Sequence, residues 1–202
     1  MMKKIYHLLF STDKKYWRKL RGELKNAGSV LDLGCGGNSP LRHIKYGNYS
    51  VGVDAQEETS KIHDRYIRAD VLDIDKIFPK KSFDAVIALD LIEHLEKERG
   101  LALLHKMETI ARKKIIIFTP NGFVEQNNSD EFQKHRSGWS LGELKNAGFK
   151  CVGMSGLKSI KRDRGAVIQK PMLFWKIIKD LSQPFIYRLP SLAFHLFCVK
   201  DI

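Results

Sequence analysis

The stretch Val30-Leu-Asp-Leu-Gly-Cys-Gly-Gly-Asn38 begins as a short apolar run and ends in a turn rich in glycine. Such a run, bounded by turn residues, is typical of a buried strand, so residues 29–33 are expected to form one. Glycines after a strand let the backbone turn tightly and approach a ligand, because no Cβ stands in the way. No Gly-Lys-Ser/Thr follows, which excludes a Walker A phosphate loop.

Further apolar runs alternate with helical stretches along the chain, which is typical of a parallel α/β sheet. We therefore expect an α/β protein with a Rossmann-like, doubly wound sheet. Its last two strands are expected to pair as an edge. The other expected strands are 49–53, 66–69, 83–89, 114–119, 149–154 and 193–199, and the expected helices are 14–26, 95–110 and 141–147.

The length of 202 residues fits one domain, 1–202, in which 155–192 forms an insertion or lid between the last two strands. The first apolar stretch is too short for a secretory signal, and no apolar run is long enough to span a membrane. We expect a cytoplasmic protein, with peripheral attachment at the inner membrane face as an alternative.

The net charge of +12 favours an anionic partner, which would be nucleic acid, a phosphorylated substrate or an anionic membrane surface. A soluble protein whose surface is simply basic is the competing interpretation. Cys35, Cys151 and Cys198 are far apart and form no Cys-x-x-Cys pair. We therefore expect three reduced cysteines, with neither a zinc site nor a disulfide.

Two acidic residues follow later strands of the expected sheet. Asp54 ends the stretch Val-Gly-Val-Asp about twenty residues after the first glycine turn, and Asp70 ends Arg-Ala-Asp after the third strand. A carboxylate in the first position accepts hydrogen bonds from ribose hydroxyls, and one in the second is placed to accept from an adenine amino group. Each could instead cap a helix at the end of its strand.

The runs VLDLGCGG, VGVD, RAD, SFDAVIALDLIEHL and IIIFTPNG, in this order, resemble the class I S-adenosylmethionine (SAM)-dependent methyltransferases over residues 28–154. The resemblance is to the small-molecule and quinone O-methyltransferase type. It implies a seven-stranded sheet, mostly parallel with an antiparallel last strand, and SAM as cofactor with S-adenosylhomocysteine as product. Asn38 departs from the pattern, because many members have a third glycine there. The residues that the resemblance assigns to SAM are Asp32, Gly34, Cys35, Gly36, Asp54, Ala55, Asp70, Val71, Leu89 and Asp90.

A nicotinamide dehydrogenase would use a similar glycine turn. The aspartate before the first glycine and the strand at 83–89 favour the methyltransferase. The loop at 119–122, Thr-Pro-Asn-Gly, follows the fifth strand and is expected to border the acceptor site.

The stretch Asp90-Leu-Ile-Glu93-His94, joined by His135 further on, carries the candidate catalytic groups. In one interpretation His94 or His135 is a general base that takes a proton from a hydroxyl acceptor. In another, Asp90, Glu93, His94 and His135 bind a divalent metal. This arrangement resembles the metal-dependent methyltransferases of small-RNA ends and of the quinone pathway, except that Asp90 replaces the usual, longer Glu. In a third, Glu93 and His94 only cap and pack a helix.

Residues 171–181 have the pattern of an amphipathic helix, and aromatic residues continue to 190. Aromatic side chains beside Lys and Arg suit a membrane surface or a lipid-linked substrate, although they also serve simply to cover a sheet. We expect methyl transfer to a small or lipid-linked acceptor, at oxygen. The alternatives are an RNA methyltransferase that uses the basic surface, and a catalytically silent SAM-binding or membrane-associated protein.

Overall fold

The computed structural model describes residues 12–37, 39–44, 49–57, 60–126, 130–162, 166–167 and 172–202. Within these residues seven strands form one sheet in the order β3-β2-β1-β4-β5-β9-β6. All seven expected strands are confirmed, with ends that differ by up to three residues. The strands are β1 (Ser29–Leu33), β2 (Tyr49–Asp54), β3 (Arg65–Arg68), β4 (Phe83–Leu89), β5 (Ala111–Pro120), β6 (Lys150–Leu157) and β9 (Ala193–Asp201).

Strands β1 to β5 are parallel to one another, and β9 runs antiparallel to both of its neighbours, β5 and β6. The expected antiparallel last strand is therefore confirmed. Strand β9 enters the sheet between β5 and β6, so β6 alone forms that edge. The glycine turn after β1 and the carboxyl ends of β2 and β4 consequently meet at one end of the sheet.

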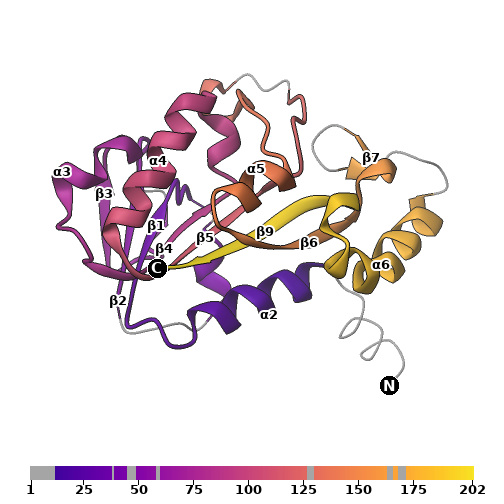
Figure 1. The fold of residues 1–202 in the computed structure, drawn as a ribbon, viewed down its shortest axis with the longest axis horizontal. Coiled ribbons are helices and arrows are strands. Elements are labelled where there is room, and N and C mark those ends of the chain that lie inside the picture. The colour runs from indigo at the N-terminus through magenta and orange to yellow at the C-terminus, as the bar shows by residue number, and fades with distance from the viewer. Residues whose placement is uncertain are drawn as a thin grey trace.

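Helices cover both faces of the sheet, as Figure 1 shows. On one face, α4 (Lys97–Ile110) and α5 (Leu141–Asn146) bury Leu103, Met107 and Leu144 against the strands. On the other face, α2 (Thr12–Leu24) buries Leu20 and Leu24. Two hydrophobic cores thus lie on opposite sides of the sheet, which confirms the doubly wound α/β class. The short helix α3 (Ile74–Ile77) and a two-stranded pair, β7 (Lys161–Arg162) and β8 (Ala166–Val167), complete the described elements.

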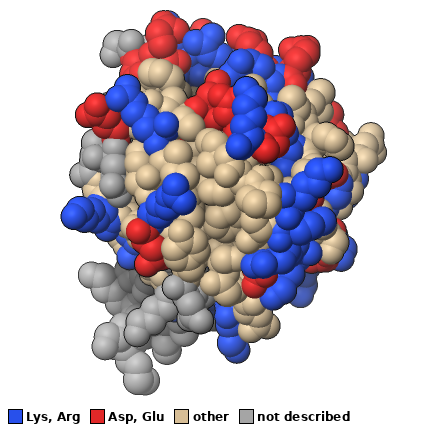
Figure 2. Space-filling view, turned by 90° about the vertical axis from the view of Figure 1, so that its left-hand side faces the viewer, with Lys and Arg blue, Asp and Glu red and all other residues tan. Residues whose placement is uncertain are grey.

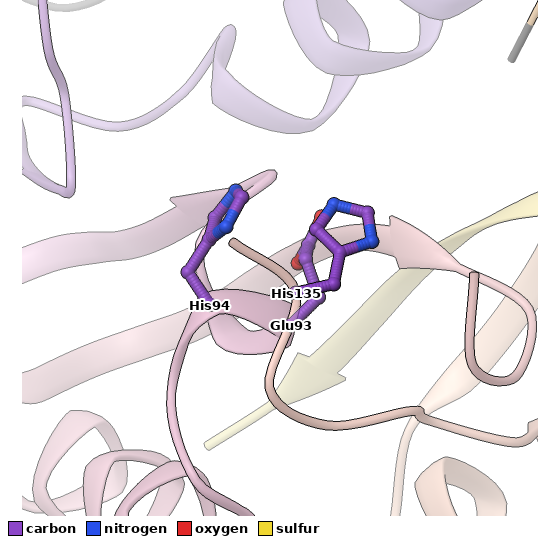
Figure 3. A group of neighbouring side chains, drawn as sticks. All are labelled: Glu93, His94 and His135. Carbon is purple, nitrogen blue, oxygen red and sulfur yellow. The ribbon is translucent and has the colours of Figure 1, made fainter. Parts of the chain in front are cut away.

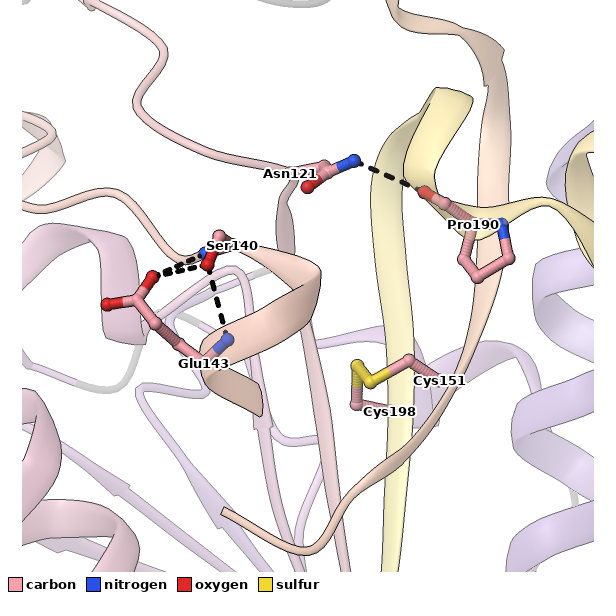
Figure 4. Close-up of a disulfide and its surroundings, with 6 residues drawn as sticks. All are labelled: Asn121, Ser140, Glu143, Cys151, Pro190 and Cys198. Atoms are coloured by element: carbon pink, nitrogen blue, oxygen red, sulfur yellow. Dashed lines mark hydrogen bonds between the residues drawn. A yellow bond between two sulfur atoms is a disulfide. The ribbon is translucent and has the colours of Figure 1, made fainter. Parts of the chain in front are cut away.

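The expectation of three reduced cysteines is wrong for two of them. Strands β6 and β9 place Cys151 directly opposite Cys198, with 4.1 Å between their Cα atoms, and the two sulfurs form a disulfide (Figure 4). Opposed residues of an antiparallel pair approach this closely without help from sequence spacing. The sequence separation of 47 between the two cysteines hid the pair in the sequence. Cys35 is free and buried.

Helix α6 (Met172–Arg188) continues seven residues beyond the expected end at 181, with Pro184 inside it. It packs closely on β6, because a Cβ on Gly153 would lie 2.2 Å from the carbonyl oxygen of Ile186. The side-chain amide of Gln183 donates to the Gly153 carbonyl at 2.9 Å and accepts from the Gly156 N–H at 3.0 Å. The described part of 155–192 therefore covers the edge strand, and its service as a lid stays a prediction.

Among the described residues, no helix is long and apolar enough to cross a membrane.

Candidate functional site

A cavity of about 470 Å³ opens at the carboxyl ends of β1, β2 and β4. It contains most of the residues that the sequence assigns to the cofactor. Those that line it are Gly34, Gly36, Asp54, Ala55, Asp70, Val71 and Asp90. The cavity also has a wall that the sequence did not predict, formed by the loop at 131–136 and by Arg99 of α4.

The glycine turn after β1 requires its glycines. Gly34 and Gly36 have φ values of 65° and 49°, a left-handed conformation that other residues rarely adopt. A Cβ on Gly34 would also lie 2.5 Å from Cδ1 of Leu91, which lines the same cavity. The backbone conformation and the close approach of Leu91 therefore both require glycine in this turn. Without side chains there, the backbone of the turn remains open to the cavity.

Asp54 joins the end of β2 to this turn. One carboxylate oxygen accepts from the Gly36 N–H at 2.8 Å, and the other accepts from the Gln56 N–H at 2.9 Å. Each carboxylate oxygen has a second lone pair, so Asp54 can hold the turn and still accept from a hydroxyl in the cavity.

Asp70, after β3, also makes two interactions at the rim of the cavity. Its carboxylate accepts from the Leu72 N–H at 2.9 Å and pairs with Arg99 at 2.7 Å. The helix-capping role considered for this aspartate is thus real, since Asp70 caps the short 3-10 turn Val71–Asp73. Capping leaves Asp70 on the cavity wall beside Val71.

Asp32, Cys35 and Leu89 are buried and are not among the residues that line the cavity. Asp32 lies behind the turn, where it accepts a hydrogen bond from the Ser39 hydroxyl at 2.5 Å. Burial raises the pKa of Asp32 from 3.8 to about 7; the Ser39 hydrogen bond opposes this shift and the charge of Asp54 adds to it. Asn38, the departure from the family pattern, lies outside the described residues.

A second pocket, of about 280 Å³, adjoins the first. The two pockets share Asp90, His94 and Gln133. Asp90 stands at the junction directly after β4, with a φ of 51°. The second pocket continues past His135 and the loop after β5, which was expected to border an acceptor, to His195 on β9.

Glu93, His94 and His135 converge in this region (Figure 3), and each has a potential ligand atom within 4.8 Å of those of the others. Glu93 and His94 belong to the 3-10 turn Ile92–His94, and His135 comes from the loop before α5. Asp90 precedes the turn and is not part of this group. Of Asp90, Glu93 and His94, which were expected on one helical turn, only the last two lie on it, and metal binding by these residues stays a prediction.

Both histidine rings are oriented by backbone carbonyls. Nδ1 of His94 lies 3.1 Å from the Lys134 oxygen, and Nδ1 of His135 lies 2.6 Å from the Val124 oxygen. A carbonyl only accepts, so each Nδ1 carries the hydrogen and each Nε2 presents a lone pair. Burial lowers the pKa of both rings, which favours the neutral form that can accept a proton or bind a metal.

Glu93 is 2% exposed and is held from two sides. Its carboxylate accepts from the Thr119 hydroxyl at 3.0 Å, and its backbone oxygen accepts from the N–H groups of Arg136 and Ser137. Burial, and then the nearby charge of Asp90, raise the pKa of Glu93 well above its usual range. Removing a carboxylate from water in this way is costly unless a cation or a proton compensates it.

The loop that carries His135 is fixed by the residues that follow it. Trp139 is fully buried, and its indole N–H donates to the Ile92 carbonyl at 3.1 Å and to the Ser137 hydroxyl at 3.0 Å. Ser140 then begins α5 with a capping box that includes Glu143 (Figure 4). The histidine is thus positioned by rigid neighbours on both sides of the pocket.

Two residues of the site were given no role of their own from the sequence. His195 lines the second pocket, with its Nε2 4.0 Å from a carboxylate oxygen of Asp90 and its ring stacked on Phe118 at 4.7 Å. Thr119 orients Glu93. Thr119 reaches Glu93 because β5 pairs with β4, whereas His195 reaches the pocket because β9 pairs with β5, and no local motif marks His195.

Comparison with known proteins agrees with this geometry. Residues 31–116 match the family described as a methyltransferase domain. No curated protein matches the chain. A SAM-dependent methyltransferase from Archaeoglobus fulgidus superposes with a TM-score of 0.62 at 21% identity, and the match covers 99% of each chain.

Two further structures share the fold at lower identity. The methyltransferase domain of a bacterial Hen1 matches with a TM-score of 0.57 at 17% identity, over 95% of this chain and 100% of that one. The 1,6-didemethyltoxoflavin-N1-methyltransferase of Burkholderia thailandensis, solved with S-adenosylhomocysteine, matches with a TM-score of 0.55 at 16% identity, over 95% and 78%.

The matched segment runs from β1 into β5 and contains the glycine turn, Asp54, Asp70 and the turn with Glu93. Over these residues the chain is similar to methyltransferase domains, and its fold is shared with solved SAM-dependent methyltransferases. SAM is the cofactor of this class. The finer resemblance to the small-molecule and quinone O-methyltransferases stays a prediction.

Proposed function

We propose that this methyltransferase transfers the methyl group of SAM to a hydroxyl oxygen of a small or lipid-linked acceptor in the 280 Å³ pocket. The observation that supports this most is the pair of oriented, neutral imidazoles, His94 and His135, in a pocket that adjoins the cofactor cavity. A hydroxyl needs a group to receive its proton when its oxygen is methylated, and these rings supply one.

In the proposed reaction the acceptor oxygen attacks the methyl carbon in line with the sulfonium. The carbon–sulfur bond breaks, and its electron pair stays on sulfur to give S-adenosylhomocysteine. The hydroxyl proton passes to Nε2 of a histidine. Much of the rate comes from holding the two reactants in line and away from water, which the walls around Asp90 and Gln133 favour.

The same residues also fit a divalent metal. Two imidazole Nε2 atoms and the Glu93 carboxylate form a suitable donor set, and each imidazole is already oriented by a carbonyl, as in known metal sites. A bound cation would compensate the buried charge of Glu93 and would lower the pKa of an acceptor hydroxyl. In that case His94 and His135 hold the metal and are not themselves the base.

The test is transfer of labelled methyl from SAM to hydroxyl compounds and to lipid extracts, before and after treatment with a chelator. Activity that disappears with the chelator and returns with added divalent metal supports the metal site. Activity that survives chelation refutes the metal site and supports a histidine base. Turnover with any acceptor refutes a catalytically silent protein, and a labelled product that carries the methyl on nitrogen refutes transfer to oxygen.

An RNA acceptor is the second candidate. Its support is the net charge of +12 and the fold shared with two Hen1 structures. One of these two proteins is described as a small RNA methyltransferase, and the match covers 25% of that protein's chain. The positive charge is not uniform, since the face in Figure 2 has a largely uncharged centre, with Lys and Arg around it that are densest toward the right-hand margin. Steeply salt-dependent RNA binding with methylation of that RNA supports this candidate, and no binding at low salt refutes it.

A further inference from the structure

Helix α6 presents an apolar face to solvent. Its outward side chains recur at spacings of three and four residues, which places them in one stripe of the helix. They are between 39% and 73% exposed. The members of this stripe are Phe174, Ile177, Leu181, Phe185 and Leu189.

The opposite side of α6 is packed against β6. The exposed stripe is therefore not the side by which this helix packs on the sheet. Gln183 and Ile186 are buried against β6, and Gln183 makes two hydrogen bonds there. Exposed apolar side chains gathered on one face of a well-packed helix indicate an interaction surface.

Helix α2 lies on the same side of the sheet as α6 (Figure 1). Tyr187 of α6 packs against the core that contains Leu20 and Leu24 of α2. The two helices also interact electrostatically: burial lowers the pKa of Lys15 on α2, Arg18 adds to this effect, and Asp180 on α6 opposes it. Both helices therefore lie on the same side of the sheet and are near one another where Lys15 faces Asp180.

The outward side of α2 is basic. Arg18, Arg21 and Lys25 are exposed and follow one another at spacings of three and four residues. Arg18 and Arg21 also line a cavity of about 420 Å³ together with Trp17 and His43. A cavity of cationic and aromatic side chains suits an anionic headgroup, whereas the neighbouring α6 stripe suits acyl chains.

We infer that this α2–α6 face, the outward sides of the two helices, docks the enzyme on an anionic lipid bilayer. The apolar stripe would enter the boundary between headgroups and acyl chains, and the basic side chains would pair with lipid phosphates. Both contributions are needed, because binding of this kind depends on buried apolar area together with attraction to anionic lipid. A protein partner would not require a basic surface beside the stripe.

The end of the stripe is close in sequence to the pocket proposed for the acceptor. Leu189 ends the stripe, and Phe194 and His195, five and six residues later, line the pocket. The connection between them is fixed, since the side-chain amide of Asn121 donates to the carbonyls of Pro190, Ser191 and Ala193. The access of a lipid-linked acceptor to this pocket rests on the proposed function, whereas the docking of the protein on the bilayer does not.

The experiment is sedimentation of the full chain with vesicles of phosphatidylcholine alone and of phosphatidylcholine mixed with phosphatidylglycerol. We expect binding to the mixed vesicles that weakens as salt is added, and little binding to phosphatidylcholine alone. Replacing Leu181→Ser and Phe185→Ser together should weaken binding by about 100-fold, on the order of tenfold for each large apolar side chain. Charge reversal by Arg21→Glu should weaken it as well.

The matched control is Leu101→Ser, because Leu101 is 52% exposed on α4 on the other side of the sheet. It should bind vesicles as the unchanged protein does. Equal binding of the double variant and the control, or equal binding to both kinds of vesicle, would overturn the inference. So would a dimer in sedimentation velocity that the double variant dissociates. Binding of S-adenosylhomocysteine should be the same in all variants, so a failure of docking remains distinct from a failure of the methyltransferase site.

Discussion

Replacing Asp54→Ala tests the cofactor-binding role of this residue, and it also removes the acceptor of the Gly36 N–H in the glycine turn. The carboxylate already accepts from Gly36 and Gln56, and its remaining lone pairs face the cavity. Hydrogen bonds to a charged group contribute about 1.5–3 kcal/mol each. Losing two ribose hydrogen bonds therefore costs about 3 kcal/mol or more, which raises the Kd for S-adenosylhomocysteine by at least about 100-fold.

Isothermal titration calorimetry measures this directly. The matched control is Asp73→Ala, because Asp73 is a neighbouring aspartate that pairs with Lys76 and does not line the cavity. Asp54→Asn should give an intermediate Kd, since it keeps one acceptor oxygen but loses the charge. A Kd for Asp54→Ala within about fivefold of the unchanged protein, in a folded variant, would refute the ribose role.

Four further predictions concern the second pocket and the stability of the fold. His135→Ala should lower the rate of methyl transfer by about 100-fold or more while the Kd for S-adenosylhomocysteine stays unchanged; a lost affinity would place His135 in the cofactor site instead. Trp139→Ala should lower the free energy of unfolding in urea by about 3–5 kcal/mol, and a cost below about 1 kcal/mol would contradict its place in the core. Reduction of Cys151–Cys198 should lower that free energy by about 2–4 kcal/mol. A double serine variant should then be insensitive to reductant, and a reductant effect that persists in it would show that the loss has another cause. The pKa of Asp32 is raised from 3.8 to about 7, so the native state holds this proton more tightly and ionisation destabilises the fold as pH rises through that range. Asp32→Asn should therefore gain stability relative to the unchanged protein between these pH values, and a difference that does not change with pH would refute the shift.

The sheet was predictable from sequence because each strand carries its own local signal. Residues 83–89 are apolar except for Asp84, and all seven side chains of β4 are buried. The order of the strands in the sheet carries no such local signal. No pattern in residues 193–201 reveals that β9 lies between β5 and β6, and the resemblance to known methyltransferases implied only that the last strand is antiparallel.

The cofactor end of the site was predicted for the same reason, since Gly34, Asp54 and Asp70 each follow a strand in a recognisable motif. The acceptor end was predicted only in part. Glu93 and His94 lie together in the sequence, whereas His195 meets Asp90 solely through long-range strand pairing. The disulfide between Cys151 and Cys198 has the same origin and was missed for the same reason.

The most direct test of the account is calorimetric titration of S-adenosylhomocysteine into the unchanged, folded protein. The cavity beside Asp54 and Asp70 predicts saturable binding of one molecule per chain. It further predicts that this binding raises the thermal unfolding temperature, because the ligand stabilises only the native state. The absence of both heat and thermal stabilisation at saturating ligand would contradict the central claim that this is a SAM-dependent methyltransferase.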